Sequence, residues 1–353
     1  MNWGSDGALE RAIGSWSRGV LPGLDVVDTH TAGNPTRIIV GGLDVPAGVE
    51  GVAATRRWLR DSADWVRRRL VHEPRGGGLT CAVLPLPADG PGHHIGAVIL
   101  EPGSYPPMCG HCMIGLSMVV DEFDLLPDVP LIDGTREFTI ATPAGPVGSS
   151  VRRGGPAATE VTLTNVDSYV VDHWSQKLGG RLVDVDLLWG GDYYATVDAD
   201  DLGLRLEPAA ALTITGLARD LAASIAERVV RDPHTGTELD VYQIMFHQSI
   251  DVGAPTSRVV VVAPPGEIDR SPCGTGSSAL LALRVARGDV AAGETLTTRS
   301  IIDTVFEVRA DAVADDAGRV IVRPLLTGTA HVTGFSRVVA DPRDGLRDGF
   351  PPI

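Results

Sequence analysis

A chain of 353 residues is too long for one ordinary hydrophobic core and indicates two domains. Hydrophobic residues make up 43% and charged residues 21%, close to globular averages, which excludes a disordered or fibrous protein. The net charge of -15 argues against nucleic-acid binding, because such proteins need a basic face to displace the counterions of the phosphate backbone.

The N-terminus and the cysteines indicate the cellular compartment. The first residues include Asp6 and Glu10 and contain no continuous apolar stretch, and no apolar run reaches the length of a bilayer span. We therefore expect a cytoplasmic protein without membrane contact. Four cysteines in so long a chain are not a disulfide framework, and in a reducing compartment a thiol is buried, catalytic or metal-binding.

The order of turns and apolar runs predicts a β-rich protein with a few helices, built as two lobes. We interpret residues 1–23 as an extension. The first lobe is expected over residues 24–180 together with 326–353, and the second over residues 181–325.

Several elements of these lobes are predicted from periodicity and breakers. The first lobe should begin with two strands around a turn at residues 33–35 and continue with one helix over residues 48–70. Further strands are expected at residues 81–86 and 95–100, and a helix of the second lobe at residues 209–231.

Two segments stand out because each places a proline and a cysteine directly before an apolar helix. In the first, Cys109 follows two prolines and precedes a run without a polar stripe until Asp121, which is typical of a buried helix. In the second, Cys273 precedes a similar helix that should end at Gly288, a C-cap candidate. The two cysteines are 164 residues apart, about one domain, which suggests an internal duplication.

A cysteine at a helix N-terminus is suited to acid–base chemistry, because the free amides and the helix dipole favour the thiolate. The same amides bind anions, so two such helix ends facing each other can hold a carboxylate between them. One thiolate then removes the proton from the α-carbon while the other cysteine, as a thiol, delivers a proton to the opposite face. The candidate carboxylate ligands are Gly110, His111, Gly274 and Thr275.

The motifs MCGH at residues 108–111 and DRSPCGTG at residues 269–276 resemble the two signatures of the proline racemase family. Supporting similarities lie at residues 28–37, 73–76, 189–203 and 300–306. The resemblance implies an α+β fold similar to that of diaminopimelate epimerase. Each lobe would then wrap a β-barrel-like sheet around a central helix, and the active site would lie in the cleft between the lobes.

The resemblance further implies that Cys109 and Cys273 are the acid–base pair and that Asp269 contacts the nitrogen of an imino-acid substrate. It assigns the carboxylate to Gly110, His111, Gly274 and Thr275, and requires neither a cofactor nor a metal. Both cysteines are present, which favours inversion, with 4-hydroxyproline 2-epimerase as the preferred activity. Proline racemase and trans-3-hydroxy-L-proline dehydratase are the alternatives, and a homodimer is left open.

This sequence departs from the usual family pattern at a few positions near the motifs. Asn34 stands where glutamate is common, and Cys112 and Met113 where glycine and threonine are common. Asp192 replaces a common asparagine and Asp303 a common glycine. The two aspartates are either hydrogen-bond acceptors for a substituted ring or changes at the surface.

The Cys109–Cys112 spacing also allows other chemistry. A CxxC pair is typical of thiol–disulfide oxidoreductases, and oxidation of Cys109 with Cys112 would block the base. Zinc binding by this pair with His111 is disfavoured, because a structural zinc site needs four ligands and the sequence has no second CxxC motif. The remaining cysteine, Cys81, lies in an apolar run and is expected to be a small buried side chain.

Overall fold

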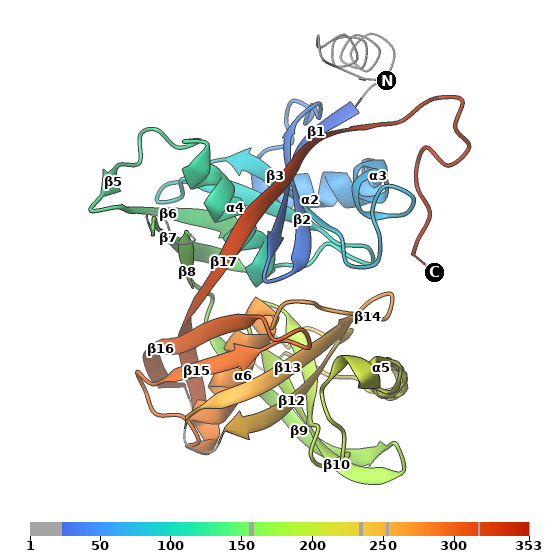
Figure 1. Cartoon of the computed structure of the whole chain (residues 1–353), viewed down its shortest axis with the longest axis vertical. Coiled ribbons are helices and arrows are strands. Elements are labelled where there is room, and N and C mark those ends of the chain that lie inside the picture. Colours follow the sequence, from blue (N-terminus) through green and yellow to red (C-terminus); the bar gives the residue numbers. More distant parts are fainter. Residues whose placement is uncertain (1–22, 155–158, 233–235, 252–253, 317, 353) are drawn as a thin grey trace, which may run out of the picture.

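The computed structural model describes residues 23–352 except for 155–158, 233–235, 252–253 and 317. The expected extension over residues 1–23 therefore lies outside the described residues apart from Gly23. The fold is a mixed α+β fold in which the seventeen described strands belong to one hydrogen-bonded, barrel-like sheet. Figure 1 shows two halves stacked along the long axis, each with strands on several sides of a helix.

The first half contains eight strands and three helices. Its strands are β1 (Gly23–Thr31), β2 (Asn34–Gly41), β3 (Cys81–Pro87), β4 (Ile95–Leu100), β5 (Leu131–Ile132), β6 (Thr135–Thr142), β7 (Gly145–Arg152) and β8 (Glu160–Thr164). Its helices are α2 (Gly51–Ser62), α3 (Trp65–Val71) and α4 (Gly110–Glu122). Helix α4 contacts β1, β2, β3, β7 and β8. It is buried from Gly110 to Asp121, as its apolar sequence predicted.

The second half repeats this arrangement around another helix. Its strands are β9 (Ser168–Leu178), β10 (Arg181–Trp189), β11 (Tyr193–Asp198), β12 (Gln243–Asp251), β13 (Thr256–Ala263), β14 (Glu267–Ile268), β15 (Thr295–Arg299) and β16 (Val305–Asp316). Its helices are the short η1 (Pro208–Ala210), α5 (Ala211–Ala226) and α6 (Gly274–Arg287). Helix α6 is buried over its first ten residues and ends at Gly288, whose φ of 78° confirms the predicted C-cap.

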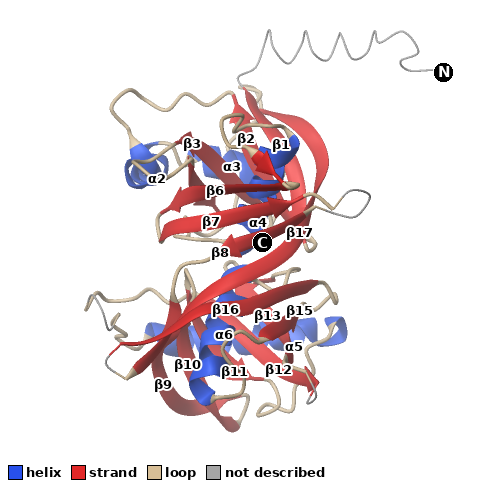
Figure 2. Cartoon of the chain, turned by 90° about the vertical axis from the view of Figure 1, so that its left-hand side faces the viewer, coloured by secondary structure: helices blue, strands red, loops and turns tan. Residues whose placement is uncertain are grey.

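One long strand joins the halves. Strand β17 (Arg319–Val339) pairs with β16 through residues 319–327 and with β1 through residues 330–339. Figure 1 shows it running from one half to the other, and Figure 2 shows strands around α4 and α6. Because β17 contacts both α4 and α6, it helps to position the two helices.

The pairing of β9 corrects the predicted lobe boundary. Strand β9 was expected in the first lobe, which was placed over residues 24–180. It pairs with β10 along its whole length through the turn at Gly179 and Gly180, and Trp174 and Leu178 pack in the core of the second half. This hairpin holds β9 in the second half. The predicted boundary at residue 325 falls inside β17.

The helix predicted over residues 48–70 is two helices in the structure. The backbone leaves the helical region at Ala63, where φ is -132°, and turns into α3. Asp64 anchors this junction, because its carboxylate accepts a hydrogen bond from the Tyr105 hydroxyl at 2.9 Å and pairs with Arg67 at 2.7 Å. Such a tertiary anchor has no signature in the local apolar pattern.

The helical stretch Pro208–Ala226 differs from the expectation about membrane spans. By length and composition alone it qualifies as a candidate span, although the sequence analysis found no apolar run of that length. Only 22% of the stretch is buried, and a single helix of this kind is weak evidence for a membrane span. In the structure Ile214, Ala218, Leu221 and Ile225 are buried, and α5 packs on β12 and β13.

Candidate active site

The N-termini of α4 and α6 meet where the halves join. A Cβ on Gly110 would lie 2.7 Å from Gly274 Cα, and a Cβ on Gly274 would lie 2.8 Å from Gly110 Cα. Both distances are shorter than real Cβ contacts, so only glycine allows this approach. Cys109 and Cys273 are the N-cap residues of the two helices, and neither helix has a side-chain cap. The amides of both first turns are therefore left for other acceptors.

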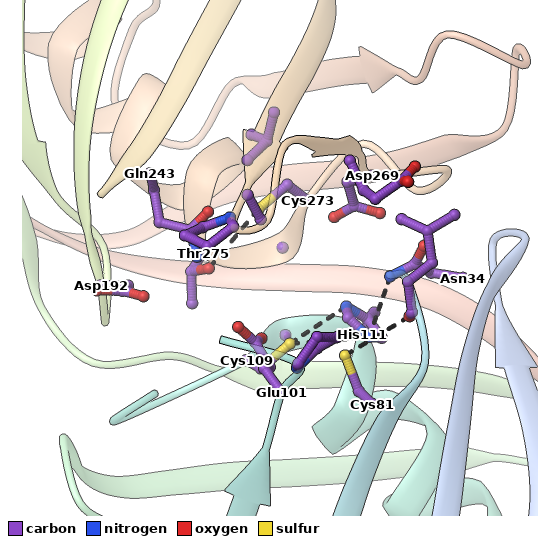
Figure 3. Close-up of a pocket in the computed structure, with 18 of the residues that line it drawn as sticks. Asn34, Cys81, Glu101, Cys109, His111, Asp192, Gln243, Asp269, Cys273 and Thr275 are labelled. Atoms are coloured by element: carbon purple, nitrogen blue, oxygen red, sulfur yellow. Dashed lines mark hydrogen bonds between the residues drawn. The ribbon is translucent and has the colours of Figure 1, made fainter. Parts of the chain in front are cut away.

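All seven residues that the sequence analysis selected line one pocket between the two halves. They are Cys109, Gly110, His111, Asp269, Cys273, Gly274 and Thr275. Figure 3 shows the side chains of Cys109 and His111 on one side of this space and those of Cys273, Thr275 and Asp269 on the other. The structure thus brings together residues from two motifs that are far apart in the sequence.

The Cys109 thiol is placed to be a base. Its Sγ lies 3.2 Å from Nδ1 of His111. A hydrogen bond with Cys112 and the positive charge of His111 lower the pKa of Cys109 well below its ordinary value, against the effect of burial. Cys109 therefore loses its proton more readily than an ordinary cysteine does.

The orientation of His111 follows from its neighbours. The Asn34 Oδ1 accepts a hydrogen bond from the Arg270 backbone N–H at 3.2 Å, so its amide nitrogen faces Nε2 of His111 at 3.3 Å. That contact favours a lone pair on Nε2. Burial lowers the pKa of His111, but the charges of Cys109 and Cys81 outweigh it and raise the pKa well above its ordinary value. The neutral ring with its lone pair on Nε2 and the doubly protonated ring both carry a proton on Nδ1, which faces Cys109.

The Cys273 thiol has the opposite character. Its backbone φ of 59° lies in the left-handed region that non-glycine residues rarely adopt. Its Sγ lies 3.3 Å from the hydroxyl of Tyr194, which is 2.6 Å from Thr275 Oγ1. Burial, and then the charge of Asp269, raise the pKa of Cys273 to about 12. Cys273 therefore keeps its proton to a higher pH than Cys109 does.

Three carboxyl groups complete the wall of the pocket, and one of them, that of Asp192, is buried. Asp269 accepts a hydrogen bond from the Ser271 backbone N–H at 2.7 Å, and burial raises its pKa. Asp192 accepts from the Tyr242 hydroxyl at 3.1 Å, and burial raises its pKa to about 7. Burial also raises the pKa of Glu101 well above its usual range.

The lining residues that were not selected for the site from the sequence include Cys81, Glu101, Tyr194 and Gln243. The pair Tyr193–Tyr194 carried a usable signal, because successive strand residues face opposite sides. Tyr194 faces Cys273, whereas the Tyr193 hydroxyl donates to Asp232 at 2.6 Å. Cys81 and Glu101 carried no such signal, since they reach the pocket only through the packing of β3 and the loop after β4.

The two aspartates that depart from the family pattern have different positions. Asp192 is 4% exposed and lines the pocket, as one interpretation of the sequence allowed. Asp303 does not line it. Its side chain is 68% exposed and forms an ion pair with Arg258 at 2.6 Å, in the turn between β15 and β16. The idea that Asp303 faces a substrate is therefore wrong, because the turn directs it to solvent.

Known proteins resemble this chain over nearly its whole length. The family model described as Proline racemase matches residues 26–351. The chain is 34% identical over 328 residues to a 4-hydroxyproline 2-epimerase of Streptosporangium roseum, covering 92% of this chain and 97% of the relative. It is 32% identical over 339 residues to a trans-L-3-hydroxyproline dehydratase of Mus musculus, covering 93% and 94%.

A solved structure agrees with these relationships. The crystal structure of a hydroxyproline epimerase from Agrobacterium vitis with bound trans-4-hydroxy-L-proline has a TM-score of 0.82 to this chain. The two are 31% identical, over 93% of this chain and 95% of the other. The chain therefore belongs to the proline racemase family of enzymes.

Proposed function

We propose that this chain is a 4-hydroxyproline 2-epimerase in which Cys109 and Cys273 exchange protons with opposite faces of the α-carbon. One observation carries the proposal. The two thiols line one pocket at two apposed helix N-termini, and their pKa values are shifted in opposite directions. The two halves then act as two lobes with the substrate in the cleft between them.

The substrate carboxylate is assigned to the helix ends. Neither first turn is capped by a side chain, and the Gly110–Gly274 contact holds the two sets of amides close together. Amides at a helix N-terminus bind anions and stabilise the negative charge that grows on the carboxylate as the α-proton leaves. Asp269 is assigned to the substrate nitrogen.

The proton transfers follow from the two protonation states. The Cα–H bond breaks, its proton goes to the Cys109 thiolate, and the electron pair spreads into the carboxylate. Cys273 then gives its thiol proton to the opposite face and becomes a thiolate. The Tyr194 hydroxyl, 3.3 Å from Cys273 Sγ, can donate a hydrogen bond to that thiolate. The reverse reaction exchanges the two roles.

The position of Asp192 favours a substrate with a hydroxylated ring over proline. It is buried, it lines the pocket, and both oxygens of its carboxylate can accept hydrogen bonds. Tyr242 and the Tyr193 N–H each use one lone pair, and a carboxylate has further acceptor capacity for a ring hydroxyl. The similarity to the Agrobacterium vitis epimerase points in the same direction.

The test is incubation in D2O with L-proline, trans-4-hydroxy-L-proline and trans-3-hydroxy-L-proline, each followed by NMR. The proposal predicts α-proton exchange with inversion, fastest for the 4-hydroxylated substrate. Inversion fastest with proline would make the chain a proline racemase, and loss of water from the 3-hydroxylated compound would make it a lyase. No reaction with any of the three would overturn the proposal.

A further inference from the structure

The thiol of Cys81 lies next to His111 and Cys112, two residues of the CxxC segment that are neither the acid nor the base of the proposed reaction. Cys81 begins β3, and the parallel pairing of β2 with β3 places it opposite Thr36. Thr36 also contacts Cys112 of α4, with 3.8 Å between Oγ1 and Sγ. Strand β2 thereby brings Cys81 and Cys112 together, and one ligand atom each from Cys81, His111 and Cys112 lies within 4.8 Å of the others.

The spacing of these atoms is close to that of a zinc site. Zinc bonds of about 2.3 Å to sulfur and about 2.0 Å to nitrogen in tetrahedral geometry place two sulfurs ~3.8 Å apart and a sulfur and a nitrogen ~3.6 Å apart. In the structure Nε2 of His111 lies 3.4 Å from Cys112 Sγ and 3.9 Å from Cys109 Sγ. Cys109 lies outside this group of three and faces Nδ1 of His111, so its side chain must turn toward the ion to become the fourth ligand.

The identity of the ligands selects the kind of ion. Thiolates and imidazole suit zinc and other soft cations, whereas calcium and magnesium require oxygen ligands. Cys81, Cys109 and His111 line the pocket, so an ion reaches them by the route of the substrate. Cys112 is completely buried and lies behind the residues that line the pocket. Asn34, now 3.3 Å from Nε2, must turn its amide aside when an ion binds.

We propose that Cys81, His111 and Cys112, with Cys109 as the fourth ligand, bind a zinc ion that inhibits the enzyme. The bound ion takes His111 and the Cys109 thiolate out of the reaction and occupies the mouth of the carboxylate site. Binding is independent of the proposed function, whereas inhibition rests on it. Cys81 is buried, as the sequence predicted, and the proposal adds a role as a metal ligand.

The experiment is a titration of the metal-free full-length protein with Co²⁺, a spectroscopic substitute for zinc, without substrate. We expect one equivalent to bind with a thiolate-to-cobalt charge-transfer band that Zn²⁺ abolishes. Cys81→Ser and Cys112→Ser should each weaken binding by more than about 100-fold, since loss of even an outer partner of a metal ligand costs about 10- to 100-fold. Cys273→Ser, which keeps all four ligands, should bind as the wild type does.

A second measurement needs no variant and so does not depend on how the variants fold. Bound zinc should protect Cys109, whose thiol lines the pocket, from alkylation in the wild type, as read by mass spectrometry. A missing charge-transfer band, or equal alkylation of Cys109 with and without zinc, would overturn the metal site. Because neither readout uses turnover, failure of the proposed function leaves them unchanged. Inhibition by Zn²⁺ is then measured as the ratio of rates with and without the ion.

Discussion

Gly110 and Gly274 touch across the junction of the two halves, and a Cβ on Gly110 would lie only 2.7 Å from Gly274 Cα. Gly110→Ala should therefore force α4 and α6 apart. We expect it to lower the free energy of unfolding by about 1–3 kcal/mol, the usual range for overpacking, and to slow turnover strongly by separating the two sets of amides. Urea unfolding and a rate assay measure the two effects.

Gly216 provides the matched control for that variant. It lies in α5, where a Cβ would meet no atom within 4 Å. Gly216→Ala should raise stability by up to about 1 kcal/mol, because alanine is the better helix former. Equal stability of Gly110→Ala and the wild type would show that the glycine contact is not required.

The pH dependence of kcat/KM should reflect the two thiols. The pKa of Cys109 lies well below 9.0 and that of Cys273 is about 12. The rate therefore rises as pH increases through the pKa of Cys109 and falls only when Cys273 loses its proton, which leaves a plateau between the two pKa values. His111→Ala removes the positive charge next to Cys109. The rise of kcat/KM on the acid side of the profile should therefore move to higher pH. An unmoved rise would contradict the assigned role of His111.

Asp192 should control the preference for a hydroxylated ring. Its pKa of about 7 means that the stronger acceptor, the carboxylate, forms as pH rises through neutrality. The KM for trans-4-hydroxy-L-proline should fall across this range while the KM for proline stays constant. Asp192→Ala should remove that pH effect and reduce the preference by roughly tenfold or more, the cost of a lost hydrogen bond to a charged group. An unchanged ratio of kcat/KM values for the two substrates would exclude Asp192 from ring recognition.

His247 should make the fold sensitive to acid. It is 1% exposed, and burial, followed by the charge of Arg284, lowers its pKa to about 3. Below the unfolded pKa of 6.5 the unfolded chain takes up a proton that the folded chain does not. The free energy of unfolding therefore falls with pH from 6.5 toward 3, by up to about 1.4 kcal/mol per pH unit. His247→Gln should show a shallower fall in urea unfolding between pH about 7 and about 5. Equal slopes for both proteins would refute this assignment.

The twin helices and their cysteines could be predicted because their signals are local. Prolines followed by a cysteine and an apolar run indicate the start of a buried helix wherever they occur. Tertiary contacts had no local signal. The pairing of β2 with β3 brings Cys81 to Cys112, and Asp64 breaks the helix predicted over residues 48–70 through its contact with Tyr105.

Polar residues near a motif were harder to place than the motif itself. Asp192 and Asp303 looked equivalent in the sequence, since both depart from a common family residue next to a similar segment. The glycine turn before β11 directs Asp192 inward, whereas the turn before β16 directs Asp303 toward Arg258 and solvent. Only the positions of these turns in the fold separate a pocket residue from a surface residue.

The central claim is that Cys109 and Cys273 act from opposite faces of one carbon, and single variants test it most directly. Cys109→Ser and Cys273→Ser are incubated with trans-4-hydroxy-L-proline in D2O, and the C2 epimer is quantified by NMR. Each variant should lose inversion by more than about 100-fold, within the range of general acid–base catalysis. Asp303→Asn, outside the pocket, should retain the wild-type rate. Inversion at the wild-type rate by either cysteine variant would contradict the two-thiol mechanism.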